Sequence, residues 1–153
     1  MTTTIVAMFE DKTSKNPKDR FKALKVLLDS GSDGDLLFEH GKKSIIPRKK
    51  RFAPQKWRTS SGTFETKDVG GLDIAFPEFS RSKKACFRPD IVRIGENEPA
   101  PVYDLIVGVK SLANMGVVLD FAAGTLTIDK VTLPMKDVGN LDMRSVCTNL
   151  GNY

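Results

Sequence analysis

Several short segments of the chain alternate apolar and polar residues, which is the pattern of a β-strand with one buried face. The clearest case is residues 21–28 (FKALKVLL), where Leu24, Val26 and Leu28 fall on one face. The same reasoning predicts further strands over residues 2–9, 72–76, 85–94 and 102–107. The pattern therefore predicts a mostly β protein.

Two hairpins are predicted from turn residues that lie between apolar segments. Residues 57–66 favour a hairpin with Ser60, Ser61 and Gly62 at its tip, because glycine tolerates the positive φ that such tips need. Residues 117–128 favour a second hairpin around an Ala-Ala-Gly turn. Both pairs of strands are local in sequence, so their pairing should be antiparallel.

One short helix and one long loop complete the predicted elements. Residues 110–115 carry apolar side chains at helical spacing, and Gly116 is placed to end that helix. Residues 41–55 are basic and contain two prolines, which indicates an irregular loop.

The composition suits one soluble domain of 153 residues, of which 40% are hydrophobic. No apolar run approaches the ~20 residues that span a bilayer, and residues 1–10 lack the pattern of a signal peptide. We therefore expect a cytoplasmic protein with no membrane partner. Cys86 and Cys147 have no Cys or His neighbours at metal-ligand spacing, so both are expected to be reduced and structural.

The formal net charge is +5, and much of the excess lies at residues 42–43 and 48–51. A nucleic-acid patch, a solvated loop, and attraction of acidic polypeptide segments are three interpretations. No RNA-binding motif, zinc knuckle or aromatic platform accompanies these charges, so a solvated loop is preferred and nucleic acid is not an expected partner. The single histidine, His40, is expected in a solvent-facing loop.

The candidate chemistry lies where the strand of residues 21–28 runs into Asp29-Ser30-Gly31-Ser32. Alone, Asp-Ser-Gly is a common turn. Here it is followed about 75 residues later by Tyr-Asp-Leu-Ile-Val-Gly (103–108), then by the short helix and Val-Leu-Asp-Phe (118–121). This order resembles the retropepsins, and more narrowly the protease region of LTR retrotransposon polyproteins of the gypsy-like or a related kind. Segments 57–64, 77–80 and 128–135 extend the resemblance, which covers roughly residues 20–136.

The resemblance implies an all-β, retropepsin-like closed barrel with one short helix and one lobe per chain. Residues 1–136 would be the protease domain, and residues 137–153 a C-terminal tail or linker. The implied activity is aspartic endopeptidase, which needs neither metal nor cofactor, acting on a polypeptide and processing a retroelement polyprotein. An inactive or domesticated fragment that acts as a binding or structural module, with its basic loop on nucleic acid, is the alternative.

The site residues follow from the same resemblance. Asp29 would be catalytic, with Ser30 and Gly31 completing the turn, while Asp33 and the flap tip Ser60, Ser61 and Gly62 would contact substrate. Relatives often carry an Arg after the apolar-apolar-Gly that pairs with the Asp33 position, but this chain has Val109 there. Because an aspartic protease needs two carboxylates around one water and this chain has one Asp-Ser-Gly, we expect a homodimer. Asp120, in Leu-Asp-Phe, is the first other candidate for a second carboxylate.

Overall fold

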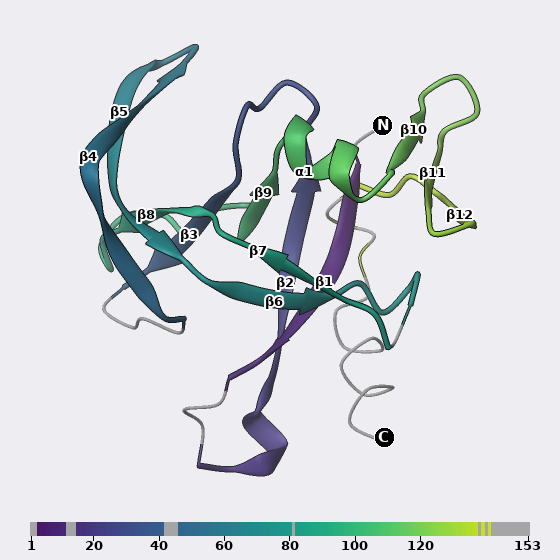
Figure 1. Cartoon of the computed structure of the whole chain (residues 1–153), viewed down its shortest axis with the longest axis horizontal. Helices are drawn as coiled ribbons and strands as arrows, with labels where there is room; N and C mark the ends of the chain where they lie inside the picture. Colours follow the sequence, from purple (N-terminus) through teal and green to yellow (C-terminus); the bar gives the residue numbers. More distant parts are fainter. Residues whose placement is uncertain are drawn as a thin grey trace.

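The structure is a computed structural model that describes residues 3–11, 15–41, 46–80, 82–137, 139 and 141 (Figure 1). Its elements are β1 (Thr4–Glu10), the 3₁₀ turn η1 (Pro17–Asp19), β2 (Phe21–Leu28), β3 (Leu36–His40), β4 (Arg48–Thr59), β5 (Gly62–Gly70), β6 (Leu72–Ala75), β7 (Lys84–Phe87), β8 (Asp90–Ile94), β9 (Leu105–Val107), α1 (Val109–Asn114), β10 (Val118–Asp120), β11 (Thr125–Ile128) and β12 (Val131–Pro134). The prediction of a mostly β fold with one short α-helix is confirmed.

Nine strands form one sheet in the order β4-β5-β8-β3-β9-β2-β1-β6-β7, and β10, β11 and β12 form a second sheet. In Figure 1 the hairpin β4–β5 projects at one side, α1 lies near the centre, and the second sheet lies at the other side. Closing a barrel requires the first and last strands to pair. Since β4 and β7 are the two ends of this order, the described strands leave the sheet open, and the expected closed barrel is wrong.

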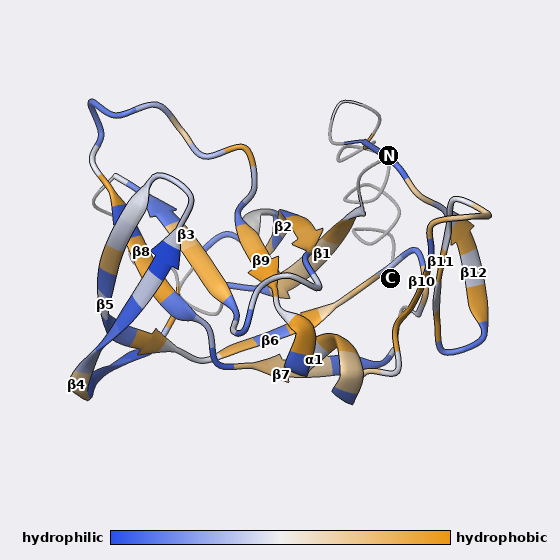
Figure 2. Ribbon diagram, turned by 90° about the horizontal axis from the view of Figure 1, so that it is seen from above, coloured by the Kyte–Doolittle hydropathy of each residue, from blue (hydrophilic) through white to orange (hydrophobic). Residues whose placement is uncertain are grey.

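The apolar strand β9 lies at the centre of the large sheet, between β2 and β3. It pairs with β2 in parallel, with Leu28 opposite Val107, and with β3 in antiparallel fashion. The side chains that the alternation of β2 assigned to one face, Leu24, Val26 and Leu28, are all buried. Figure 2 shows these central strands as a largely hydrophobic block.

The helix α1 ends as the sequence predicted. Gly116 has φ +66°, a conformation that favours glycine. The amide of Gly116 donates to the carbonyl of Ala113 (3.1 Å), and the amide of Val117 donates to the carbonyl of Leu112 (3.0 Å). These two bonds form a Schellman motif, which satisfies the last carbonyls of the helix and turns the chain toward β10.

Two predicted elements have the wrong extent and one strand was not predicted, and each difference has a local cause. The expected loop over 41–55 contains the start of β4, whose pairing with β5 absorbs Pro54 through a register shift between Lys50 and Gln55. The expected strand over 85–94 is two strands, because Pro89 interrupts it. The strand β12 was not predicted, since its turn uses Asp129 and Lys130 at positive φ, where a turn signal normally shows glycine.

Some predictions fall outside the described residues. These include Lys42 and Lys43, Cys147, and most of the tail expected over residues 137–153. Within the described part, no helix is long and apolar enough to cross a membrane.

Candidate functional site

The Asp29 turn (residues 29–34) directly follows the buried end of β2 and is held mainly by backbone hydrogen bonds. The amide of Asp29 donates to the carbonyl of Val107 (2.9 Å), and the amide of Ser32 donates to the carbonyl of Asp29 (3.1 Å). The amide of Gly31 donates to Asp29 Oδ1 (2.9 Å). The carboxyl of Asp29 is thus oriented by its own turn while remaining partly exposed.

The glycine after β9 allows β9 to approach this turn closely. A Cβ on Gly108 would lie 2.6 Å from the carbonyl oxygen of Gly34 and 2.7 Å from that of Ser32, which is closer than real Cβ contacts. The next amide, that of Val109, donates to the carbonyl of Ser32 (2.8 Å). The Ile-Val-Gly pattern noted in the sequence therefore has a steric cause.

Asp35 joins the Asp29 turn to the start of α1, and the sequence reasoning missed it. Its Oδ1 accepts from the amide of Gly108 (2.7 Å), and its Oδ2 accepts from the hydroxyl of Ser111 (2.6 Å). Both partners lie more than 70 residues away in the chain, so no local pattern marks this aspartate.

Asp33, expected to contact substrate, is exposed at the edge of the turn. In the described part of the chain its side chain has no hydrogen bond or ion pair. That placement agrees with the replacement of the usual arginine by Val109, which is an exposed residue at the start of α1. Ser30 and Gly31 are exposed as well.

The hairpin β4–β5 confirms the hairpin predicted over residues 57–66 and is longer than predicted. Thr59 pairs with Gly62, so Ser60 and Ser61 form the tip. Gly62 has φ +138°, and a Cβ added there would meet no atom within 4 Å, so a side chain would be strained by the backbone and not crowded. The hydroxyl of Thr59 donates to the carbonyl of Gly62 (3.1 Å) and closes the tip.

Trp57 connects this hairpin to the Asp29 turn. A Cβ on Gly34 would lie 2.8 Å from the Trp57 ring, so the ring covers that glycine. The indole Nε1–H donates to the hydroxyl of Thr66 (3.0 Å), and the ring stacks on Phe64 with centroids 6.1 Å apart. Trp57 is therefore packed at the base of the hairpin.

Two arginines of β4 are tied to carboxylates of other strands. Arg48 binds both oxygens of the buried Glu39 on β3 (2.5 and 2.6 Å). Arg51 binds both oxygens of the buried Asp90 on β8 (2.6 and 3.1 Å). These bonds raise the pKa of Arg51. Half of the basic run at 48–51 is thus structural, which corrects the expected solvated loop there.

A cleft of about 470 Å³ lies between the Asp29 turn and the hairpin. Its lining residues come from the turn, from β4, from β8 and from α1: Gly31, Ser32, Asp33, Gly34, Arg51, Gln55, Lys56, Trp57, Arg58, Asp90 and Lys110. The structure thus brings the Asp29 turn and the hairpin to one opening. Of the predicted site residues, Gly31 and Asp33 line this cleft, whereas the lining does not include Asp29, Ser30 or the tip residues Ser60, Ser61 and Gly62.

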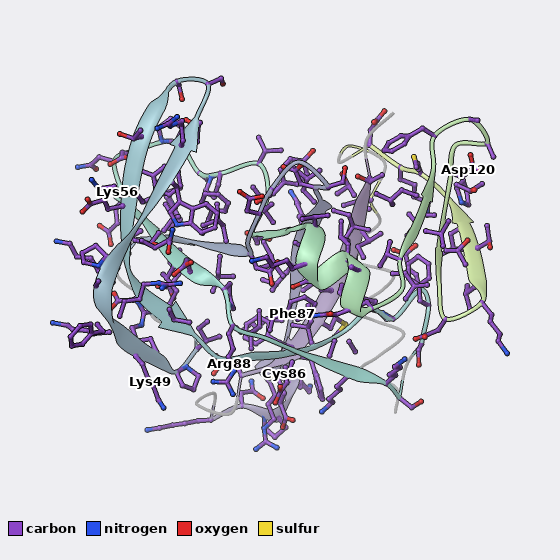
Figure 3. All side chains as sticks on the ribbon, turned by 45° about the horizontal axis from the view of Figure 1, so that its top comes forward. Lys49, Lys56, Cys86, Phe87, Arg88 and Asp120 are labelled. Carbon is purple, nitrogen blue, oxygen red and sulfur yellow. The ribbon has the colours of Figure 1, made fainter. Side chains whose placement is uncertain are left out.

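The other candidate groups lie elsewhere. The Oδ1 of Asp120 accepts from the amide of Ala123 (2.9 Å), so Asp120 closes the β10–β11 turn. Figure 3 shows Asp120 and Lys56 on opposite sides of the view. His40 is exposed as expected, with Nε2 2.8 Å from the carbonyl oxygen of Glu98, but it is the last residue of strand β3 and not part of a loop. Cys86 is exposed, and a hydrogen bond with Asp73 raises its pKa. No metal-binding cluster occurs among the residues that the structure describes.

The fold and the order of its elements define a retropepsin-like protease fold. A solved structure with this fold is the retroviral protease-like domain of Ddi1 from Leishmania major, which superposes with a TM-score of 0.51 over 92% of this chain and 98% of that chain, at 12% sequence identity. At this identity the likeness shows the fold alone. This chain is also larger than the single retropepsin lobe that the sequence resemblance implied. No family model matches the chain, and no curated protein matches it.

Proposed function

We propose that the protein is an aspartic endopeptidase that acts as a homodimer, with Asp29 of each subunit supplying one carboxylate. One observation carries this proposal. Asp29 ends a buried strand in a turn held by Val107 and closely approached by Gly108, beside a cleft bordered by a hairpin. Such a turn keeps a carboxylate in a fixed orientation next to space for a polypeptide, which general-base chemistry requires.

The proposed reaction uses the two Asp29 carboxylates around one water. Like charges this close do not both ionise readily, so the pair holds one proton. The ionised carboxylate takes a proton from the water, which attacks the peptide carbonyl. The protonated carboxylate stabilises the oxyanion and later helps protonate the leaving amine. Gly31, which has no side chain next to Asp29, leaves room for the peptide backbone, and Ser30 would hydrogen-bond across the two-fold axis.

A second subunit is proposed because the described part of the chain offers one suitable turn. Asp120 serves the β10–β11 turn, and Asp104 accepts a hydrogen bond from the amide of Lys25 (2.8 Å). A two-fold axis through the Asp29 turns supplies the missing carboxylate with the same geometry. Processing of the polyprotein of a retroelement, in the cytoplasm, is the proposed biological role.

The test compares Asp29→Asn with Asp120→Asn in a peptidase assay. Asn keeps the shape of Asp29 but is not a base, so the rate should fall at least ~10³-fold. Asp120→Asn retains an acceptor for the amide of Ala123, so its rate should stay near that of the wild type. Normal proteolysis by the Asp29→Asn protein, or loss in the Asp120 variant, would contradict the assignment.

The same proteins test the dimer. Mixed in equal amounts with free exchange, wild-type and Asp29→Asn subunits leave about a quarter of the dimers with both carboxylates. The activity per total protein in the mixture should fall to about a quarter of that of the wild type alone. The specific activity of the wild type should also fall when the protein is diluted. Full activity of a monomer by sedimentation would rule out the shared site.

A further inference from the structure

The charges that line the cleft are unequal in number. Four cations line it, Arg51, Lys56, Arg58 and Lys110, against two carboxylates, Asp33 and Asp90. Arg51 and Asp90 neutralise each other through two hydrogen bonds (2.6 and 3.1 Å). Three cations and one carboxylate are left. Asp29, which lies beside the cleft, adds a second carboxylate and still leaves a positive excess.

The three remaining cations are available to a ligand. Lys56, Arg58 and Lys110 are all exposed, and within the described residues none of them forms an ion pair. They surround the opening from two elements, β4 and α1. Figure 3 shows Lys56 on the hairpin, away from the centre of the molecule. A cleft bordered by unpaired charges of one sign concentrates ligands of the opposite sign.

The way in which β4 borders the cleft indicates the shape of that ligand. β4 is the end strand of the nine-stranded sheet, so one of its edges has no neighbouring strand among the described residues. Four consecutive residues of β4, 55–58, line the cleft, whereas no residue of β5 does. An extended polypeptide fits along such an edge by backbone hydrogen bonding.

The period of a β-strand then sets the spacing. Lys56 and Arg58 are two residues apart and lie on the same face of β4, opposite the face of Trp57. A polypeptide extended beside this edge presents every second side chain to that face. Two carboxylates at alternate positions would therefore meet Lys56 and Arg58, while the intervening side chain would meet Trp57.

We propose that the cleft selects extended polypeptide segments with acidic side chains at alternate positions, and that Lys56, Arg58 and Lys110 determine this specificity. The proposal rests on the proposed endopeptidase function, because it names the substrate class of that same cleft. It also gives the three unpaired cations a role that the ion-paired Arg48 and Arg51 do not share.

The test uses three degenerate peptide libraries that carry Glu, Gln or Lys at two alternate positions. Glu peptides should be cleaved with a kcat/KM about tenfold above that of Gln peptides, a size suited to a few exposed ion pairs. The preference should shrink in about 0.5 M salt, because salt screens exposed charges. The double variant Lys56→Glu/Arg58→Glu should prefer Lys peptides. Lys67→Glu, which reverses an exposed charge on β5 outside the cleft, should keep the wild-type preference.

Binding of the same libraries to the Asp29→Asn protein separates the two proposals. Cleavage without a Glu preference would overturn the specificity and leave the endopeptidase function standing. A Glu preference in binding without cleavage by the wild type would do the reverse. Competition experiments compare a single-stranded oligonucleotide with unlabelled Glu peptides as displacers of bound Glu peptides. Displacement by the oligonucleotide at the lower concentration would overturn the specificity in favour of a nucleic-acid surface.

Discussion

The Asp29 turn and the strand β4 border the same cleft, but different interactions hold them in place. The turn is fixed by backbone bonds to Val107 and from Val109, and by the absence of a side chain at Gly108. The strand β4 pairs with β5 through its backbone, and side chains tie it to the other strands: Arg48 on Glu39 and Arg51 on Asp90. The Asp29 turn therefore depends mainly on close backbone approach, whereas β4 has two side-chain ion pairs in addition to its backbone pairing.

This difference bears on the proposed endopeptidase function. A carboxylate that does chemistry gains from a backbone frame, since backbone bonds do not change with pH or salt. A hairpin that must admit a polypeptide is better anchored at its base and free at its tip. The two ion pairs lie at the first half of β4, while the tip at Ser60 and Ser61 is exposed.

The largest expected effect breaks the backbone frame. Gly108→Ala places a Cβ about as close as 2.6 Å to a carbonyl oxygen, so β9 has to move away from the Asp29 turn. We expect the free energy of unfolding to fall by about 3 kcal/mol. Gly71→Ala is the matched control, because a Cβ there meets no atom within 4 Å. Urea unfolding of both variants measures the difference, and equal midpoints would show that close approach at Gly108 is not needed.

The second effect removes charge from the other border. In the Arg48–Glu39 pair the side chains are 20% and 2% exposed, and Arg48 Nη1 is buried without a hydrogen-bond partner in the described residues. Glu39→Gln leaves the guanidinium largely buried and uncompensated, which should cost about 2 kcal/mol. The control is Asp129→Asn in the pair with Lys83, which is 67% exposed on the lysine side and should cost under ~1 kcal/mol. Similar losses in the two variants, by urea unfolding, would mean that burial does not distinguish these pairs.

The two borders also differ in how far the sequence predicts them. The strand of residues 21–28 and the turn at Asp29 carry local patterns, so their structure could be predicted, whereas the parallel pairing of β2 with β9 was not. The roles of Arg48 and Arg51 could not, because their partners are set by tertiary folding: 9 residues away for Arg48 and 39 for Arg51. A basic segment with two prolines resembles a solvated loop until those partners are known.

Partners that are set by tertiary folding also explain why Asp35 was not predicted as part of the site. Asp35 precedes a buried strand and has no neighbours in the sequence that suggest its role. Its function is set by Gly108 and Ser111, which β9 and α1 bring beside it. The open sheet was missed because closure depends on how the end strands β4 and β7 lie, which alternation within a strand does not reveal.

The smallest expected effect is on the pH dependence of stability, and it concerns the carboxyl of Asp104, next to the strand β9 that holds the Asp29 turn. Asp104 precedes β9, and its carboxyl accepts from the amide of Lys25 (2.8 Å) while its own amide donates to the carbonyl of Lys25 (2.9 Å). Burial raises the pKa of Asp104 above its ordinary value of 3.8, although the hydrogen bond from Lys25 opposes this change. The folded protein therefore keeps this proton to higher pH than the unfolded chain does.

Because the folded state binds more protons between the two pKa values, ionisation of Asp104 lowers stability as pH rises above 3.8 toward the raised pKa. Asp104→Asn removes this loss and keeps an acceptor for Lys25. The difference in the free energy of unfolding, variant minus wild type, should therefore increase across that interval and become constant above it. The total increase should be smaller than the loss expected for Glu39→Gln. Urea unfolding at a series of pH values measures the difference. A difference that decreases with rising pH would mean that the carboxyl of Asp104 is stabilised in its ionised form, and a constant difference would mean that folding leaves its pKa unchanged. Either result would contradict the prediction.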